Sequence, residues 1–119
     1  MKVKSKKTLK KSCDIAWALK VRQTNNGFCE MCGQPAQNSH HVISRNNHTL
    51  RYDIRNGANL CISCHMFSRN SAHQNSLLFL EWFKSSRPED YEYIKQKSNT
   101  IAHYSILDYQ EILTQLRLL

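Results

Sequence analysis

Two C-x-x-C motifs constrain the fold of this 119-residue chain more than any other feature. The first runs from Cys29 to Cys32 and the second from Cys61 to Cys64. Four thiolates suit tetrahedral zinc and fill its coordination, so we predict a structural zinc with no open position for chemistry. The segment between the motifs is longer than a compact zinc ribbon allows, and it must have structure of its own. Cys13 has no partner in this pattern and is predicted to pack within a helix.

Length and composition favour one globular domain, with 40% hydrophobic and 22% charged residues. No apolar run reaches the length of a membrane-spanning helix. The basic N-terminus is not followed by an apolar segment, so we expect no secretory leader and a cytoplasmic location. In that setting, metal binding is a better explanation of the cysteines than disulfides.

The chain has 17 Lys and Arg against 9 Asp and Glu, a net charge of +8 that indicates a polyanionic partner. Residues 1–11 contain lysines and no acid, and are predicted to form a flexible basic tail ahead of a domain at 12–119. A solvated tail and an arm that tracks phosphates both remain open. The lysines nearest the domain are Lys6, Lys7, Lys10 and Lys11.

Local patterns predict an α+β fold in which one small hairpin is surrounded by helices. Ser12 can cap a helix over 12–23, which Asn25-Asn26-Gly27 would end. Residues 39–43 and 50–54 are the hairpin strands, and Asn56-Gly57 is a tight turn. A helix of about ten residues is expected from position 62.

Three further helices are predicted near the C-terminus. Asn75 can cap the first, over 76–85, which is apolar nearly all round and therefore expected to be buried. Ser86 and Glu89 have capping-box spacing for a helix over 88–97. The last begins near Ser105, and it could pack on its own domain or on a second subunit.

Histidines are concentrated between and beside the cysteine motifs. His40 and His41 are adjacent on the first predicted strand, and His65 immediately follows Cys64. A zinc ion bound by both motifs would bring His65 near the pair. We therefore expect a site of fixed geometry there.

These segments resemble a known family. S-H-H-V-I-S-R, R-Y-D-I-R-N-G and L-C-I-S-C-H are similar to the HNH endonucleases, also called His-Me finger or ββα-metal nucleases. The likeness runs over residues 29–73, and A-H-Q-N-S-L-L-F-L-E-W-F resembles small phage and prophage HNH proteins. The resemblance implies a ββα-metal core, DNA as substrate, and a bacterial host or phage setting.

The resemblance also implies a role for each residue of the motif. His40 and His65 would hold a catalytic divalent ion, Mg²⁺, Mn²⁺, Ni²⁺ or Zn²⁺, and His41 would be the general base. The assignment between His40 and His41 rests on the family alone. Asn56 would orient the base through a hydrogen bond, although turn chemistry also explains it. Asn59 is the rival, but it lies too close to Cys61.

DNA contacts are expected from residues around this motif. Arg45 and Arg51 flank the hairpin loop, where they would clamp phosphates or simply be solvated. His73 is a third ligand, a phosphate contact or a helix-end residue, and we favour the last two. The rival function is a non-catalytic zinc knuckle that binds nucleic acid. A homodimer and a phage DNA-processing partner remain open.

Overall fold

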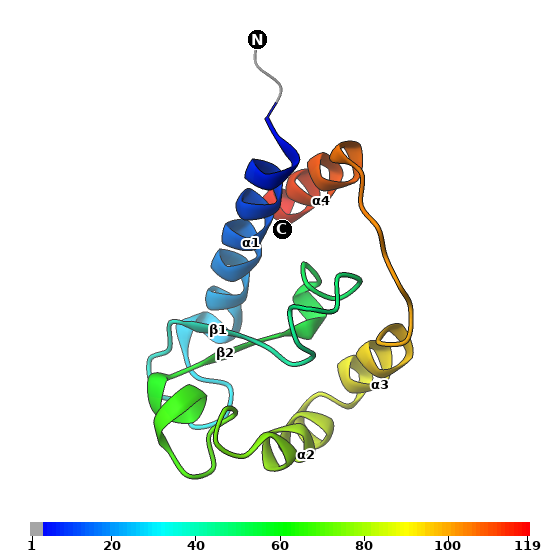
Figure 1. Ribbon diagram of the computed structural model, residues 1–119. Coiled ribbons are helices and arrows are strands. Elements are labelled where there is room, and N and C mark those ends of the chain that lie inside the picture. The colour runs from blue at the N-terminus through cyan, green and yellow to red at the C-terminus, as the bar shows by residue number, and fades with distance from the viewer. Residues whose placement is uncertain (1–3) are drawn as a thin grey trace.

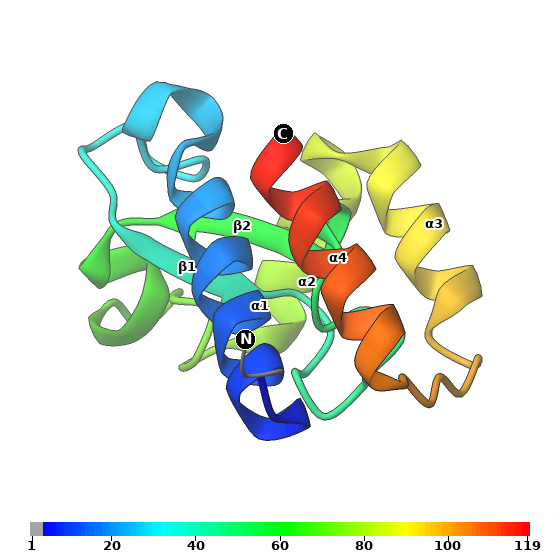
Figure 2. The same ribbon diagram turned by 90° about the horizontal axis from the view of Figure 1, so that it is seen from above.

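The computed structural model describes residues 4–119 and shows an α+β architecture (Figures 1 and 2). Its sheet pairs strand β1 (Asn38–His41) antiparallel with strand β2 (Gly57–Leu60), in a register that sets His40 opposite Ala58. Residues 1–3 of the expected tail lie outside the described part. The α-helices around the sheet are α1 (Lys6–Arg22), α2 (Ser76–Ser86), α3 (Pro88–Lys97) and α4 (Ile106–Leu118).

Helix α1 begins six residues before the expected cap at Ser12, so that expectation is wrong. The cap is Ser5, whose Oγ accepts a hydrogen bond from the Thr8 backbone N–H at 3.2 Å. The helix extends this far because Leu9 and Cys13 lie on one face and are buried against α4. Residues 6–11, expected to belong to a flexible tail, are therefore helical.

The predicted end of this helix is confirmed. Asn25 and Asn26 both have φ of 54° and Gly27 has φ of 81°. Asparagine and glycine tolerate this left-handed region better than other residues. The chain therefore turns immediately after α1 and enters the first cysteine motif.

The second strand of the hairpin was predicted in the wrong place. Residues 50–54 form turns that bury Leu50 and Tyr52 in different clusters, and a short 3₁₀ turn, Ile54–Asn56, precedes β2. Gly57 is the first residue of the strand and not part of a tight turn. A Cβ on Gly57 would lie 2.5 Å from Val21 Cγ2, so glycine lets α1 pack directly on the strand.

The segment after the second cysteine motif is a single π-helical turn, Ser63–Phe67, instead of a ten-residue helix. The chain then reverses direction. The backbone N–H of Ala72 donates to the Cys64 carbonyl at 2.7 Å, and that of His73 donates to the His65 carbonyl at 3.1 Å. Residues 72–73 are thereby held beside residues 64–65.

The C-terminal helices agree closely with the sequence. Asn75 caps α2 through a hydrogen bond from Leu78 N–H, and Ser105 exchanges hydrogen bonds with Asp108 at the start of α4. Two details of the prediction were wrong. The capping box expected at Ser86 does not form, because Arg87 precedes the first turn of α3 and provides no side-chain cap. Helix α2 is not buried all round: it buries Phe79 and Phe83 but leaves other apolar side chains exposed.

Helix α4 packs against α1 in both ribbon views (Figures 1 and 2). Among residues 4–119, no helix combines the length and apolar character that crossing a membrane requires.

Candidate metal centres and active site

The four cysteines of the two motifs converge on one point. The Sγ atoms of Cys29, Cys32, Cys61 and Cys64 all lie within 4.8 Å of one another, and none forms a disulfide. Four sulfurs bound to zinc at about 2.3 Å would stand about 3.8 Å apart. The donor set and its spacing therefore fit a tetrahedral zinc.

Backbone geometry builds the two halves of this cluster. In the first motif, Gly33 has φ of 80° and its N–H donates to the Cys29 carbonyl, which closes the turn. In the second, the Cys64 N–H donates to Cys61 Sγ at 3.4 Å. Burial raises the pKa of the Cys29 thiol, but hydrogen bonds from neighbouring backbone N–H groups outweigh it and lower that pKa to about 7. These bonds favour the thiolate at Cys29, whereas burial raises the pKa of the Cys64 thiol, which a bound zinc would have to deprotonate.

Cys13 lies apart from the cluster, as predicted. It is fully buried in α1 and donates to the Tyr109 carbonyl at 3.4 Å. Burial raises the pKa of its thiol to about 11. Cys13 is therefore an unreactive packing residue.

A second cluster consists of three histidines. His40 of β1, His65 of the π turn and His73 of the reversed segment place their ring nitrogens within 4.8 Å of one another. The Nε2 atoms of His65 and His73 are 3.0 Å apart. Imidazole nitrogens bound to one ion at about 2.1 Å would be about 3.0–3.4 Å apart. The three rings therefore fit a single divalent ion.

The protonation states of two of these rings support this fit. Burial, and then the charges of the neighbouring histidines, lower the pKa of His40 to about 3. Burial also lowers the pKa of His65. Both rings are therefore neutral near pH 7, the state in which imidazole binds a metal.

His41 is excluded from this cluster and is held separately. Its ring stacks on Trp17 of α1, with centroids 3.8 Å apart and planes 10° apart. Its Nε2 lies 2.9 Å from the Arg51 carbonyl oxygen. A carbonyl only accepts, so Nε2 carries the proton and Nδ1 keeps its lone pair. Burial lowers the pKa of His41, while the bond to Arg51 opposes that effect.

Asn56 does not orient His41 through a direct hydrogen bond, contrary to the prediction. Its side chain is fully buried and bonds the loop between the strands: Oδ1 accepts from Ile43 N–H at 2.7 Å, while Nδ2 donates to the carbonyls of Ile43 and Leu50. Asn56 thus holds the loop that carries Arg51. Asn59, the rival candidate, also bonds to a group other than His41, because its Nδ2 donates a hydrogen bond to the Arg22 carbonyl.

The two arginines expected to clamp phosphates differ in position. Arg51 forms two hydrogen bonds with Asp14 of α1, at 2.9 and 2.8 Å, and only 13% of its side chain is exposed. Its guanidinium is therefore already paired. The side chain of Arg45 is 63% exposed and lies 3.9 Å from Asp14, so it remains available to a ligand.

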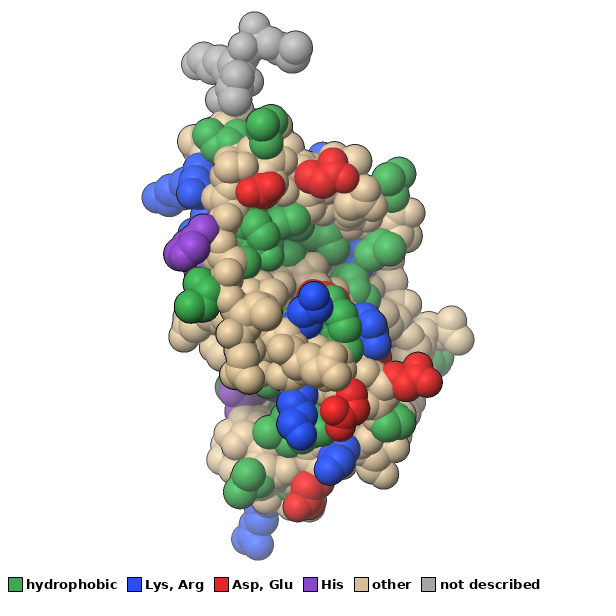
Figure 3. Space-filling model, turned by 90° about the vertical axis from the view of Figure 1, so that its right-hand side faces the viewer, with side chains coloured by type: hydrophobic (Ala, Val, Ile, Leu, Met, Phe, Trp, Pro, Cys, Tyr) green, Lys and Arg blue, Asp and Glu red, His purple; other side chains and the backbone are tan. Residues whose placement is uncertain are grey.

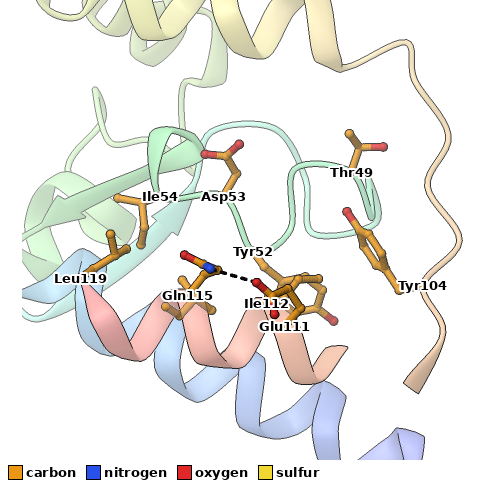
Figure 4. A pocket seen from close by; sticks show the side chains of 10 residues that line it. Thr49, Tyr52, Asp53, Ile54, Tyr104, Glu111, Ile112, Gln115 and Leu119 are labelled. Atoms are coloured by element: carbon orange, nitrogen blue, oxygen red, sulfur yellow. Dashed lines mark hydrogen bonds between the residues drawn. The ribbon is translucent and has the colours of Figure 1, made fainter. Parts of the chain in front are cut away.

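One cavity of about 430 Å³ is lined by His41, by the three clustered histidines and by Arg45. Another cavity of about 440 Å³ lies between α4 and residues 49–54 (Figure 4). Tyr52, Tyr104 and Ile112 line that second cavity, and no histidine or cysteine contributes to its walls. The cavity with the histidines is therefore the candidate active site.

Sequence reasoning undervalued His73 and missed Asp14 and Trp17. The expected continuous helix put His73 away from His65, but the turn-forming run Ser68-Arg69-Asn70-Ser71 indicated the reversal. Asp14 and Trp17 act across long sequence separations, for which no local pattern exists.

Comparison with known proteins identifies the central segment. Residues 29–68 match the family model described as HNH endonuclease, whereas no curated protein and no solved structure matches the chain. The matched segment contains both cysteine motifs, the sheet and three of the four histidines that line the cavity, and it stops before His73. Residues 29–68 of this chain are therefore an HNH endonuclease domain with the four-cysteine cluster of an HNH zinc site.

Proposed function

We propose that this chain is a metal-dependent endonuclease that hydrolyses phosphodiester bonds in DNA. The observation that carries the proposal is the position of His41, which lines the same cavity as three clustered histidines and keeps a free lone pair on Nδ1. A general base beside a divalent ion is the arrangement that phosphodiester hydrolysis needs. Residues 12–119 would act as one nuclease domain.

His41 takes a proton from the attacking water in this mechanism. The Arg51 carbonyl keeps the proton on Nε2, and the Trp17 ring fixes the plane of the imidazole. The base therefore needs no reorientation when the substrate binds. The exposed guanidinium of Arg45 contacts a phosphate oxygen at the rim of the cavity.

His40, His65 and His73 would hold the catalytic ion, which stabilises the charge that develops on the phosphate and on the leaving oxygen. Three imidazole ligands would leave further coordination positions for water and substrate. They suit Zn²⁺, Ni²⁺ or Mn²⁺, whereas Mg²⁺ prefers oxygen ligands. His73, for which a phosphate contact or a helix-end position was favoured over a ligand role, is thus proposed as a ligand.

The test is cleavage of plasmid DNA by wild type and by His41→Ala. Loss of a general base typically slows the reaction by about 10²–10⁴-fold. Zinc content, folding and DNA binding should stay near wild type, because His41 binds neither metal. His103→Ala is the matched control, since His103 is exposed and lies outside the cavity. A His41→Ala protein that cuts at the wild-type rate refutes the mechanism.

Metal titration separates the roles of the remaining histidines. His40→Ala, His65→Ala and His73→Ala should need more metal to reach a given rate, whereas His41→Ala should lower the plateau at saturating metal. The alternative function is a zinc knuckle that binds nucleic acid without cutting it. Wild-type protein that binds DNA but never cuts it, with any divalent metal, would favour that alternative.

A further inference from the structure

We propose that a basic groove along the first half of α1 binds the phosphate backbone of the DNA that the histidine site cuts. This inference rests on the proposed function for its substrate, but it concerns a separate surface. The groove has a volume of about 520 Å³. Its walls are formed by Lys6, Lys7, Lys10, Lys11, Asp14 and Arg51.

The side chains that line the groove are predominantly positively charged. Asp14 is its only acid among the described residues, and Arg51 already neutralises that carboxylate through two hydrogen bonds. Four lysine ammonium groups therefore remain for a ligand. On the face that forms the right-hand side of Figure 1, by contrast, acidic and basic side chains are interspersed (Figure 3). A concentrated field of one sign attracts a polyanion more strongly than a mixed surface does.

The groove adjoins the candidate active site. Arg45 lines the cavity with the histidines and lies 3.9 Å from Asp14 of the groove. Arg51 lines the groove with its side chain, while its carbonyl holds His41. Arg45 of the cavity and Asp14 of the groove thus lie side by side. The sugar-phosphate backbone of a DNA strand that leaves the cavity past Arg45 would enter the groove directly.

The spacing of the lysines suits a duplex. They lie on a regular helix, in which residues four apart share a face. At a rise of about 1.5 Å per residue, Lys11 lies about 7.5 Å along the helix from Lys6. Phosphates of one strand in B-form DNA are about 3.4 Å apart along the axis, so this length spans about three of them. Because α1 is buried against α4, the lysines are presented by a rigid element.

The test compares Lys7→Gln/Lys10→Gln/Lys11→Gln with the control Lys84→Gln/Lys95→Gln/Lys97→Gln. Both triple variants remove the same charge from helical positions, and the control lysines are exposed on α2 and α3. Both are made in the His41→Ala background, which keeps the DNA intact. Binding of a fluorescent duplex is then measured by anisotropy from 50 to 200 mM salt.

Each lost phosphate contact should reduce the slope of log affinity against log salt by about 0.9. Raising the salt from 50 to 200 mM weakens binding of the parent by a certain factor. For the groove variant, that factor should be about 10–40 times smaller. The control should keep the parental slope. With His41 present, the groove variant should raise KM for a long duplex and leave kcat unchanged.

Equal effects of the two triple variants, or an unchanged slope in the groove variant, would overturn the inference. Failure of the parent to bind duplex at 50 mM salt would do so as well. A wild-type protein that binds through the groove but does not cut would contradict the proposed function alone.

Discussion

The orientation of His41 depends on residues outside its own strand. Trp17 stacks on the ring and donates its Nε1–H to the Asp53 carbonyl at 2.8 Å, which ties α1 to the loop before β2. The Arg51 carbonyl belongs to that same loop. Asn56 stabilises the loop through three hydrogen bonds to backbone groups. Asn56 therefore affects His41 through the position of the loop.

Asn56→Ala tests this indirect role. Removing the side chain leaves buried backbone groups of Ile43 and Leu50 without partners, so we expect a loss of about 2–4 kcal/mol in the free energy of unfolding. Urea denaturation measures this loss, and cleavage should fall along with it. Asn70→Ala is the control, since Asn70 is exposed, and it should change stability by less than about 0.5 kcal/mol. Wild-type stability with abolished cleavage in Asn56→Ala would instead indicate a direct catalytic role.

At the level of elements, the sequence predicted those features that local chemistry determines. The caps at Asn75 and Ser105 and the turn after α1 follow from side chains within a few residues of each boundary. The cysteine cluster followed from the spacing of its motifs. Strand β2 was misplaced because its pairing depends on α1 packing against Gly57, a contact between distant segments. The grouping of His73 with His65 likewise depends on the reversal after the π turn.

The π turn joins the two candidate metal sites, because Cys64 and His65 are consecutive residues within it. Cys61→Ser should therefore lose the zinc, unfold more readily and weaken the catalytic ion site together. Elemental analysis should find about one tightly held zinc per wild-type chain and much less in the variant. Cys13→Ala is the control and should keep its zinc, since Cys13 lies outside the cluster. Well-folded wild type without zinc would contradict this prediction.

On the scale of the whole molecule, three buried clusters support the candidate active site. The first lies between α1 and α4, the second joins the cysteine turns to the sheet, and the third packs α2 and α3 against the loop. Arg87 links the last two, because its guanidinium donates to the Gly57 carbonyl at 2.7 Å and to Glu30 at 3.2 Å. Helix α4 completes the first cluster, so it packs on its own domain and supports the helix that carries Trp17.

Leu113→Ala tests this supporting role of α4. Leu113 is buried against α1, and its truncation should cost about 2–4 kcal/mol through lost contacts and a cavity. In a domain of this size, each kcal/mol corresponds to about 3–6 °C in Tm. Leu107→Ala is the matched control on the same helix, because Leu107 is 75% exposed, and its Tm should stay near wild type. At temperatures where both variants are folded, their cleavage rates should be equal, since neither residue lines the cavity with the histidines. If Leu107→Ala were the more damaging change, and if the wild-type Tm rose with protein concentration, α4 would be docking on a second subunit instead.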